Sequence, residues 1–412
     1  MPLEPARTVA ELNELRELTG NADGAQRVCW TDTWATARSW LLAKLEELPV
    51  TVEIDEAANV WATLKGEADH EVLLGGHMDS VPNGGWLDGC LDTLAGLESL
   101  RRFAEGGTPP VSVRLVDWAD EEGARFGRSL LGSSACSGTL DVEGIRELTD
   151  RDGVRLPDAL AGHGVDIERM KQCHRQLERA RAYIELHIEQ GPVLEGLALP
   201  LGAVLGTFGV ERHLIRFRGQ AAHSGSTPMA DRRDAFAGAA RLAIEIHENT
   251  RSVGDGAVST TGSVVTEPGI VTAVAGVCEM TLDQRHLDAG VLAGMLAHAR
   301  EAGGRIAAEE RLEVEWEHLW SIAPIPFDTT LIDLADEAIV EVAGASHRLP
   351  SGPLHDAAEV ARAGVPTVML FVQSLNGLSH TKEEDTLAEH VEQSVAALDR
   401  LAAKAVHWVA AG

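Results

Sequence analysis

Five residues of types that bind metal ions lie in short motifs, most of which begin where a predicted strand ends. An apolar run from Leu73 stops at His77, and a second apolar run, Val113–Trp118, is followed by Glu121 and Glu122. Ligands in open α/β sheets bind beyond the carboxyl ends of the strands, so motifs at these positions point into one crevice. Mixed imidazole and carboxylate ligands suit divalent cations. The pattern predicts a two-metal hydrolytic centre with the ligands His77, Asp88, Glu122, His187 and His380.

The two neighbouring acids after the second strand are expected to have separate roles. Adjacent side chains diverge, so Glu122 is assigned to a metal ion and Glu121 to proton transfer. A metal ion lowers the pKa of bound water toward about 7, and a nearby carboxylate takes the proton and later passes it to the leaving amine. Asp88, which follows a loop of turn residues, is the expected bridge between the cations. Asp79 lies on the same side of the extended chain as His77 and is predicted to accept the second N–H of that imidazole.

Each motif alone also has an ordinary structural explanation. A histidine at a strand end is usually hydrogen-bonded, two adjacent glutamates usually begin a solvated helix, and Asp-Gly is usually a turn. The metal-site hypothesis is favoured because the candidates recur beside glycines at strand ends. The chain also contains no Gly-x-Ser-x-Gly elbow, phosphate-binding loop or Cys-x-x-Cys pair that would indicate another chemistry.

Four segments resemble, in order, those of the hydantoinase/carbamoylase family. They are His77–Gly85 (HMDSVPNGG), Glu121–Phe126 (EEGARF), His187–Pro192 (HIEQGP) and Ala222–Met229 (AHSGSTPM), within a resemblance that extends from about residue 73 to 386. This family contains N-carbamoyl-L-amino acid hydrolases, β-ureidopropionase and allantoate amidohydrolase, among the aminoacylase-like and carboxypeptidase-like metallopeptidases. The resemblance implies the same five ligands, with Asp88 as the bridge and Glu121 as the general base.

The resemblance also implies residues that contact a substrate. Arg285 is expected to bind a carboxylate with its planar guanidinium, although a strand arginine is more often paired at the surface, here with Asp283. His223, reaching in from the partner subunit of a dimer, is expected to donate to a developing oxyanion, although a loop histidine is usually solvated. Gln190 can interact with an amide or ureido group through both a donor and an acceptor, unless it only holds the adjacent turn. Ser379 is a further candidate for substrate contact.

Three departures from the family pattern bear on the substrate. Asp92 stands where the family commonly has glycine, and an extra carboxylate there is expected to hydrogen-bond a metal ligand, to lie behind the ligands, or to change the metal preference. Thr272 stands in place of an asparagine and is expected to keep one hydrogen bond to the substrate. Pro353 and Leu354 put a rigid ring and a bulky apolar side chain into a loop expected near the metals, which disfavours close approach of a substrate to that backbone.

Composition limits the class of protein. The chain has 412 residues and a formal net charge of −29, with a pI near 4.9, which argues against nucleic-acid and anionic-membrane partners. A small carboxylate substrate remains compatible, because Arg285 can act locally against a field that salt screens beyond roughly 8 to 10 Å. The five cysteines are odd in number and widely spaced, which is typical of reduced thiols. Without a predicted signal peptide or membrane span, the protein is expected to be cytoplasmic.

The spacing of apolar residues predicts two domains. Helices are expected at 9–18 and 31–48, followed by alternating strands and helices, which favour an α/β catalytic domain with a mixed sheet in three layers. The middle of the chain predicts a ferredoxin-like β-α-β-β-α-β order. Its expected elements are a strand at 212–218, a helix at 229–248, strands at 257–274 and 277–285, a helix at 289–309 and a strand at 312–319. The catalytic domain is therefore predicted at 1–207 and 323–412, with an inserted lid and dimerisation domain at 208–322.

These observations together predict a dimeric amidohydrolase with two divalent metal ions. The ions are zinc, manganese, cobalt or nickel, among which the ligand types do not discriminate. Metal-bound hydroxide is expected to cleave a linear C–N bond of an N-carbamoyl or ureido amino acid. An aminoacylase or dipeptidase, and a specialised amide hydrolase of secondary metabolism, remain alternatives. A dimeric scaffold with a degraded site is the non-enzyme alternative.

Overall fold

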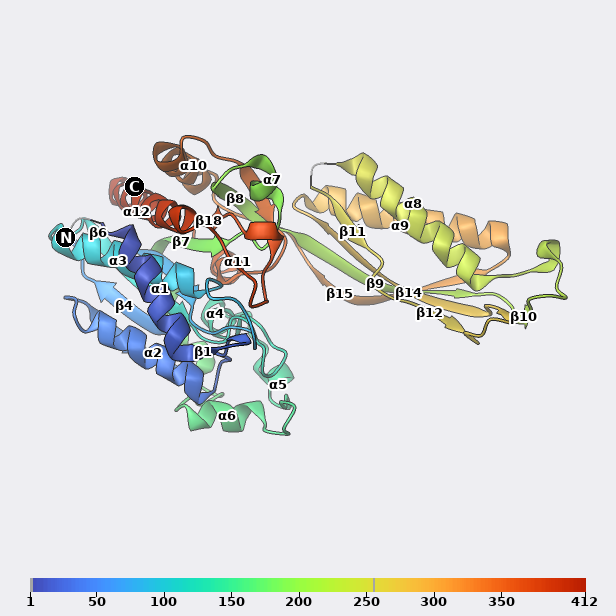
Figure 1. Ribbon diagram of the computed structural model, residues 1–412, viewed down its shortest axis with the longest axis horizontal. Helices are drawn as coiled ribbons and strands as arrows, with labels where there is room; N and C mark the ends of the chain where they lie inside the picture. The colour runs from blue at the N-terminus through green and yellow to red at the C-terminus, as the bar shows by residue number, and fades with distance from the viewer. Residues whose placement is uncertain (1–2, 255) are drawn as a thin grey trace. The chain divides into compact units, whose positions relative to one another are not determined.

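The computed structural model describes residues 3–254 and 256–412, which form two compact units (Figure 1). The first unit comprises the chain up to Gly206 together with Phe327–Gly412, and the second is Thr207–Pro326. The second unit is thus an insertion into the first. Each unit has its own hydrophobic core.

The first unit is built on a mixed sheet, as the sequence predicted, and this sheet has nine strands among the described residues. Its strand order is β16-β8-β18-β7-β5-β6-β4-β3, with β17 also paired to β8. Neighbours β18, β7, β5 and β6 are parallel, whereas β8, β4 and β3 add antiparallel edges. The strands are β3 Thr51–Ile54, β4 Val60–Leu64, β5 Ala68–His77, β6 Val111–Trp118, β7 Ala180–Ile188, β8 Leu201–Thr207, β16 Ile325–Pro326, β17 Arg348–Ser351 and β18 Thr367–Val372; β1 Gly20–Asn21 and β2 Gly24–Ala25 form a separate hairpin.

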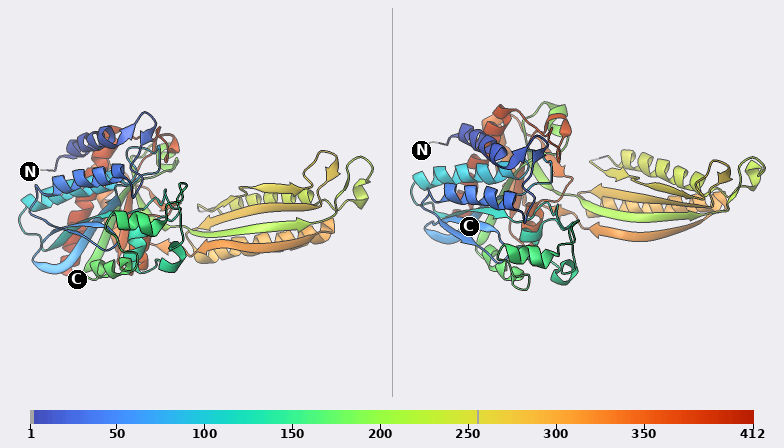
Figure 2. Two further views of the ribbon diagram at one scale, coloured as in Figure 1. Left: turned by 90° about the horizontal axis from the view of Figure 1, so that it is seen from below. Right: turned by 60° about the horizontal axis from the view of Figure 1, so that its bottom comes forward.

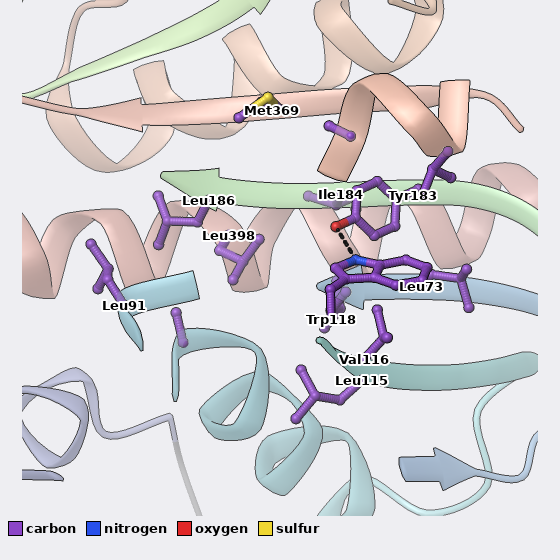
Figure 3. Close-up of a cluster of buried hydrophobic side chains, with 14 of the residues drawn as sticks. Leu73, Leu91, Leu115, Val116, Trp118, Tyr183, Ile184, Leu186, Met369 and Leu398 are labelled. Carbon is purple, nitrogen blue, oxygen red and sulfur yellow. Dashed lines mark hydrogen bonds between the residues drawn. The ribbon is translucent and has the colours of Figure 1, made fainter. Parts of the chain in front are cut away.

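Helices cover both faces of this sheet. Alternate residues of β7 face opposite ways: Ile184 and Leu186 point toward α12, while Glu185 accepts a hydrogen bond from the backbone of Ala357 in α11 at 2.8 Å (Figure 3). The α helices are α1 Pro5–Thr19, α2 Asp32–Leu45, α3 Cys90–Glu105, α4 Leu131–Ser137, α5 Val142–Ile145, α6 Leu156–Gly162, α7 Val193–Leu197, α10 Thr329–Ala343, α11 Asp356–Arg362 and α12 Ala388–Ala411; the 3-10 helices are η1 Met170–Leu177 and η3 Leu375–Gly377. The three-layer prediction is confirmed.

The second unit has two helices on one face of an antiparallel sheet of order β11-β14-β9-β15, with β12 also paired to β14 (Figure 2). Alternate residues of β14, among them Cys278, Met280 and Leu282, are buried beneath the helices. The elements are β9 Gly209–Arg218, β10 Ala222–His223, η2 Met229–Asp231, α8 Ala235–Val253, β11 Val258–Thr260, β12 Val264–Glu267, β13 Ala273–Val274, β14 Val277–His286, α9 Ala289–Glu310 and β15 Glu313–Ile322.

Two boundaries in this unit differ from the sequence prediction. The single strand expected at 257–274 is wrong, because the structure has three short strands there, β11, β12 and β13. Pro268 and Gly269 lie in the second break, and proline cannot donate to a strand ladder. The helix expected from 229 begins only at Ala235, where the Asp234 side chain accepts hydrogen bonds from the first turn at 3.0 and 3.3 Å.

The core of the first unit contains polar bonds as well as apolar packing. Trp118 at the end of β6 donates its indole N–H to the hydroxyl of Tyr183 in β7 at 2.9 Å, and that hydroxyl donates to Glu185 at 2.7 Å (Figure 3). These bonds join two strands that are not neighbours, across β5, where Gly75 leaves room for the tyrosine ring. Across residues 3–254 and 256–412, no helix has the length and apolarity needed to cross a membrane.

Candidate metal centre

The five predicted metal ligands lie in one cluster of the first unit. Their side chains form two groups of three, and within each group the potential ligand atoms all lie within 4.8 Å of one another. Asp88 belongs to both groups, in the position expected of a bridging carboxylate. The first group is His77, Asp88 and His187, and the second is Asp88, Glu122 and His380.

The parallel strands in the middle of the sheet bring these residues together. His77 is the last residue of β5 and His187 is near the end of the neighbouring strand β7, so both imidazoles emerge at one edge of the sheet. Glu122 follows β6 on the other side of β5. Asp88 precedes α3, and His380 lies in the loop between η3 and α12. The site therefore forms at the carboxyl ends of parallel strands.

Backbone carbonyls orient the two buried histidines. The Nδ1 of His77 lies 3.1 Å from the carbonyl oxygen of Asp79, and the Nδ1 of His187 lies 2.9 Å from that of Ile188. A carbonyl only accepts, so each Nδ1 carries the proton and each Nε2 presents a lone pair. Those Nε2 atoms face Asp88 Oδ1 at 3.7 and 3.2 Å. Acceptors that face one another in this way require a cation, or a proton, between them.

Asp79 acts on the site differently from the prediction. The Asp79 carboxylate was expected to accept the imidazole N–H of His77, but its nearest oxygen is 3.6 Å from Nδ1, farther than the backbone carbonyl. The carboxylate instead accepts the backbone N–H groups of Glu121 and Glu122, both at 3.2 Å. Asp79 thus fixes the loop that carries the two acids.

Burial and charge in the cluster favour bound cations. Burial raises the pKa of Glu122 to about 7, with the neighbouring Asp88 acting in the same direction. Burial alone would lower the pKa of His77 and of His187, but the surrounding carboxylates raise both well above the ordinary value. Several carboxylates are therefore held in a space where water does not solvate them. Divalent cations fit this donor set, because they supply the positive charge that protons would otherwise provide.

Glu121 lies beside the ligands without belonging to either group. Its Oε2 is 3.8 Å from the Nε2 of His77, and the residue is only 8% exposed. Burial raises the pKa of Glu121 well above its ordinary range, although His77 opposes the shift. A buried carboxylate of raised pKa next to the cluster has the properties of a proton acceptor and donor.

The loops around the cluster hold unusual backbone conformations. Asp120, Gln190 and His380 have φ angles of 60°, 57° and 57°, in the left-handed region that residues other than glycine rarely adopt. Such conformations persist where the surrounding structure imposes them, and they cluster at functional sites. All three residues adjoin or include the predicted ligands and the predicted base.

Gln190 and Ser379, predicted to contact substrate, both touch the bridging carboxylate. The Nε2 of Gln190 donates to Asp88 Oδ2 at 2.9 Å and to the Ser379 hydroxyl at 3.0 Å. The Ser379 oxygen lies 3.0 Å from Asp88 Oδ2. Among the described residues, the buried Oε1 of Gln190 has no hydrogen-bond partner. This acceptor remains available to a ligand, whereas the Ser379 hydroxyl is already engaged.

Glu384 is a residue of the site that the sequence analysis missed. Its Oε1 accepts the backbone N–H groups of Leu87 and Asp88 at 3.1 and 3.0 Å, and its Oε2 lies 3.2 Å from the Ser379 hydroxyl. Gly85 allows this approach, because a Cβ there would come within 2.1 Å of the Glu384 carboxyl. Glu384 thus joins the loops that carry the bridge and His380. In the sequence it is one acid within a polar stretch, with no local signal of burial.

We predict that Glu384→Ala weakens metal binding. Loss of the carboxylate leaves two buried N–H groups beside Asp88 without an acceptor and frees the His380 loop, so metal affinity falls by about 10- to 100-fold. Competition with a chromophoric chelator measures this change. Glu383→Ala is the matched control, because Glu383 is exposed and its carboxylate accepts a hydrogen bond from Thr381. Equal affinity in the two variants would refute the positioning role.

Asp92 lies behind the site but makes no hydrogen bond to a ligand. It is 1% exposed, and neither carboxylate oxygen has a hydrogen-bond partner among the described residues. Burial raises its pKa well above the ordinary value. Its side chain rests against Gly76 of β5, where an added Cβ would come within 2.2 Å of the Asp92 Cβ. The space that Asp92 occupies therefore depends on the glycine before His77.

We predict that Gly76→Ala destabilises the protein by about 1–3 kcal/mol through this overlap. Removing the opposing side chain with Asp92→Gly is expected to recover part of the loss, which a double-mutant cycle of urea unfolding measures. Gly294→Ala serves as the control, because open space surrounds that helical glycine. Purely additive effects of the two substitutions would show that Asp92 is not the obstacle.

The loop of residues 351–356 approaches the first metal group through a histidine. The ring of His355 lies 4.3 Å from that of His187, centroid to centroid, and its Nε2 is 2.9 Å from the Ser351 hydroxyl. Burial, with the neighbouring His187 acting in the same direction, holds the pKa of His355 well below its ordinary value. Pro353 is exposed and Leu354 half-buried. The sequence analysis placed this loop near the metals but did not single out His355.

The remaining predicted substrate residues lie in the second unit: His223 and Thr272 at one end of it, by the small separate sheet of β10 and β13, and Arg285 on β14 of the main sheet. His223 is exposed on β10, which pairs with β13, and Ser224 donates to the carbonyl of Thr272 at 2.9 Å. The Nδ1 of His223 accepts the N–H groups of Gly225 and Ser226 at 3.1 and 3.2 Å. The proton is therefore on Nε2, and this N–H is available to donate.

Arg285 belongs to the opposite end. It pairs with Val210 at the start of β9, whereas His223 follows the end of that strand at Arg218. The two positions are separated by about 25 Å, at roughly 3.3 Å per residue. The Arg285 guanidinium lies 2.8 Å from Asp283, which also binds Arg212 at 2.7 Å. Arg285 thus forms the surface ion pair with Asp283 that is usual for an arginine on a strand.

Comparisons with known proteins find related hydrolases that match most of the chain. The model of "Peptidase family M20/M25/M40" matches residues 73–404. The N-carbamoyl-L-amino acid amidohydrolase of Geobacillus stearothermophilus is 35% identical over 364 residues, covering 88% of this chain and 88% of that protein. The allantoate amidohydrolase of Escherichia coli (strain K12) is 31% identical over 389 residues, covering 92% and 94%. The crystal structure of a hydantoinase/carbamoylase family amidase from Burkholderia multivorans matches with a TM-score of 0.88 and 31% identity, covering 98% of both chains.

Proposed function

We propose that this chain, which belongs to peptidase family M20/M25/M40, uses two metal ions to cleave an N-carbamoyl or ureido amino acid. Its motifs resemble those of the hydantoinase/carbamoylase amidases. Hydrolysis of C–N bonds is common to its relatives, and metal dependence is typical of its family. The observation that carries the proposal is the pair of ligand groups that share Asp88, with Glu121 beside them.

Each residue of the centre has a task in this reaction. His77, Asp88 and His187 would hold one cation, and Asp88, Glu122 and His380 the other. Bound cations polarise the scissile carbonyl and lower the pKa of water in the site. Glu121 removes a proton from the attacking water and delivers it to the leaving nitrogen. Asp79 and Glu384 keep the base and the bridge in position through their bonds to backbone N–H groups.

Gln190 supports a ureido substrate. Its Nε2 is already used by Asp88 and Ser379, which fixes the orientation of the amide, because the reverse orientation would set Oε1 against a carboxylate oxygen. The buried Oε1 lacks a partner among the described residues and can accept an N–H of a carbamoyl group. A simple acyl group offers no such second N–H. This difference favours ureido compounds over N-acyl amino acids.

We infer that the second unit serves as a lid and dimerisation domain. Arg285 would bind the substrate carboxylate, because a planar guanidinium suits bidentate contact with a carboxylate. An amino acid derivative is much shorter than the roughly 25 Å between Arg285 and His223, so one substrate does not contact both residues of one chain. His223, with Thr272, would therefore serve the site of the partner in a homodimer. The exposed Val264 and Val265 of β12 provide apolar surface for that contact.

The deciding experiment is a substrate panel with metal-reconstituted protein. N-carbamoyl amino acids, N-carbamoyl-β-alanine and allantoate are compared with N-acyl amino acids and dipeptides by ammonia release and substrate loss. Turnover of ureido compounds is expected, with complete loss after chelation and recovery with zinc, manganese, cobalt or nickel. Activity confined to acyl or peptide bonds would support the aminoacylase or dipeptidase alternative. The differences from the family pattern at Thr272, Pro353 and Leu354 favour that alternative. Absence of any turnover would contradict the proposal.

A further inference from the structure

Two cysteines far apart in the sequence touch in the structure. The Sγ atoms of Cys136, in the last turn of α4, and Cys173, in η1, are 3.1 Å apart. Their relative exposures are 2% and 0%. The sequence spacing indicated no close pair, so this contact depends on the way η1 packs against α4. Neither thiol takes part in the proposed reaction.

The surroundings of the pair do not favour a metal ion, although a carboxylate lies close by. Asp55 Oδ2 is 3.7 Å from the Cys136 Sγ. Its Oδ1 already accepts the N–H groups of Ala57 and Asn59, both at 2.9 Å, and its Oδ2 accepts from the side chains of Trp61 and Asn59 at 2.8 and 2.9 Å. A carboxylate with this many donors has little capacity left for a cation. The two sulfur atoms remain as the reactive groups.

The pair is connected to the loop that carries Glu121. At the start of α4, the backbone N–H of Leu130 donates to the carbonyl of Glu121 at 2.7 Å, and that of Leu131 to Asp120 at 3.1 Å. The side chain of Asn59 spans the same region, since it accepts from Ala119 N at 3.0 Å and its Nδ2 lies 3.5 Å from the Cys136 Sγ. A bond at Cys136 therefore constrains a helix whose other end holds the proposed base.

We propose that Cys136 and Cys173 are a site of reversible oxidation, at which a peroxide converts the two thiols into a disulfide. One thiol attacks the peroxide, gives a sulfenic acid and releases water or an alcohol. The second thiol then attacks the sulfenic sulfur and releases water, so two S–H bonds and one O–O bond are exchanged for one S–S bond and two O–H bonds. A disulfide needs the sulfur atoms about 2.05 Å apart, roughly 1 Å closer than here. Movement of η1 by that amount closes the bond.

The disulfide would tie α4 to η1 across the intervening segment, which contains α5 and α6. Cross-linking restricts the unfolded chain, so the oxidised protein should resist heat better than the reduced protein. Because both sulfur atoms are buried, the reaction should be slow and should favour small oxidants. Thiol reductants restore the original state.

The test uses metal-loaded protein treated with hydrogen peroxide. Titration after denaturation should find free thiols reduced from five to three, and mapping without reductant should find a peptide joining positions 136 and 173, lighter by two hydrogen atoms. The unfolding temperature should rise by roughly a few degrees and return after dithiothreitol. Cys173→Ser should abolish the cross-link and the shift, whereas Cys278→Ser, which removes another buried thiol, should retain both.

Three results would overturn the proposal. One is the absence of the joined peptide at peroxide levels that oxidise methionines in the same sample. Another is over-oxidation of Cys136 or Cys173 to sulfinic acid without the cross-link. The third is a thermal shift that persists in Cys173→Ser. Peptide mapping of the unaltered protein does not depend on any variant, so a poorly folding variant leaves the test decisive.

Discussion

Replacing Glu121 by Gln is expected to abolish turnover while both metal ions remain bound. Gln keeps the shape of the side chain but has no carboxylate to accept a proton, and general acid–base catalysis contributes about 10²- to 10⁴-fold. Glu121 belongs to neither ligand group, so the metal content should not change. Initial rates on an N-carbamoyl amino acid measure the first effect, and elemental analysis of the dialysed protein measures the second.

Glu67→Gln provides the matched control for this variant. Glu67 is exposed before β5 and has no place in the site, so its substitution should leave both rate and metal content unchanged. If Glu121→Gln retained full activity, the assignment of the base would be wrong. If it lost activity together with metal, Glu121 would be a ligand, and the division of roles between Glu121 and Glu122 would have to be revised.

His223→Ala is expected to reduce turnover by about 10²- to 10³-fold, the usual effect of removing a donor to a developing oxyanion. The Nε2–H that it removes is exposed at the far end of the second unit from Arg285. If His223 acts in the partner's site, mixing this variant with Glu121→Gln and allowing the subunits to exchange should restore activity. Each mixed dimer then has one site with both native residues, which gives about a quarter of the wild-type rate.

The mixing experiment tests whether His223 acts in the site of the partner subunit or in the site of its own subunit. Activity that stays at the level of the separate variants, in samples where exchange of subunits is demonstrated, would place His223 in its own subunit's site or outside the reaction. His247→Ala removes another exposed histidine of the same unit and should neither lower the rate nor complement Glu121→Gln. This control excludes a general effect of altered surface charge.

Several parts of the site could be predicted because the signal is local. The apolar runs of β5 and β6 identify buried strands, and His77, Glu121 and Glu122 follow directly at or after their ends. Parallel strands then bring such ends together, so the clustering of ligands follows from the spacing. The mixed sheet and the two long helices of the inserted unit were predictable for the same reason, since apolar periodicity differs between strands and helices.

Other features depend on segments that meet only after folding. Glu384 binds the N–H group of Asp88 across a sequence separation of 296 residues, and its own neighbours in the chain are polar. Strand periodicity placed Asp79 beside His77, with 3.6 Å between its Oδ1 and the imidazole Nδ1, but it did not indicate that the carboxylate would also accept the N–H groups of Glu121 and Glu122. Cys136 and Cys173 have no spacing that indicates contact.

The sequence by itself determined which residue types stand at the ends of which strands, and hence the chemistry of the centre. Only the tertiary structure decided how two groups share Asp88, why Gly76 must face Asp92, and that Arg285 and His223 lie at opposite ends of the second unit. The physical reason is the distance along the chain over which each effect acts. Propensity and periodicity act over a few residues, whereas burial, excluded volume and backbone hydrogen bonds between distant loops are set when the chain packs.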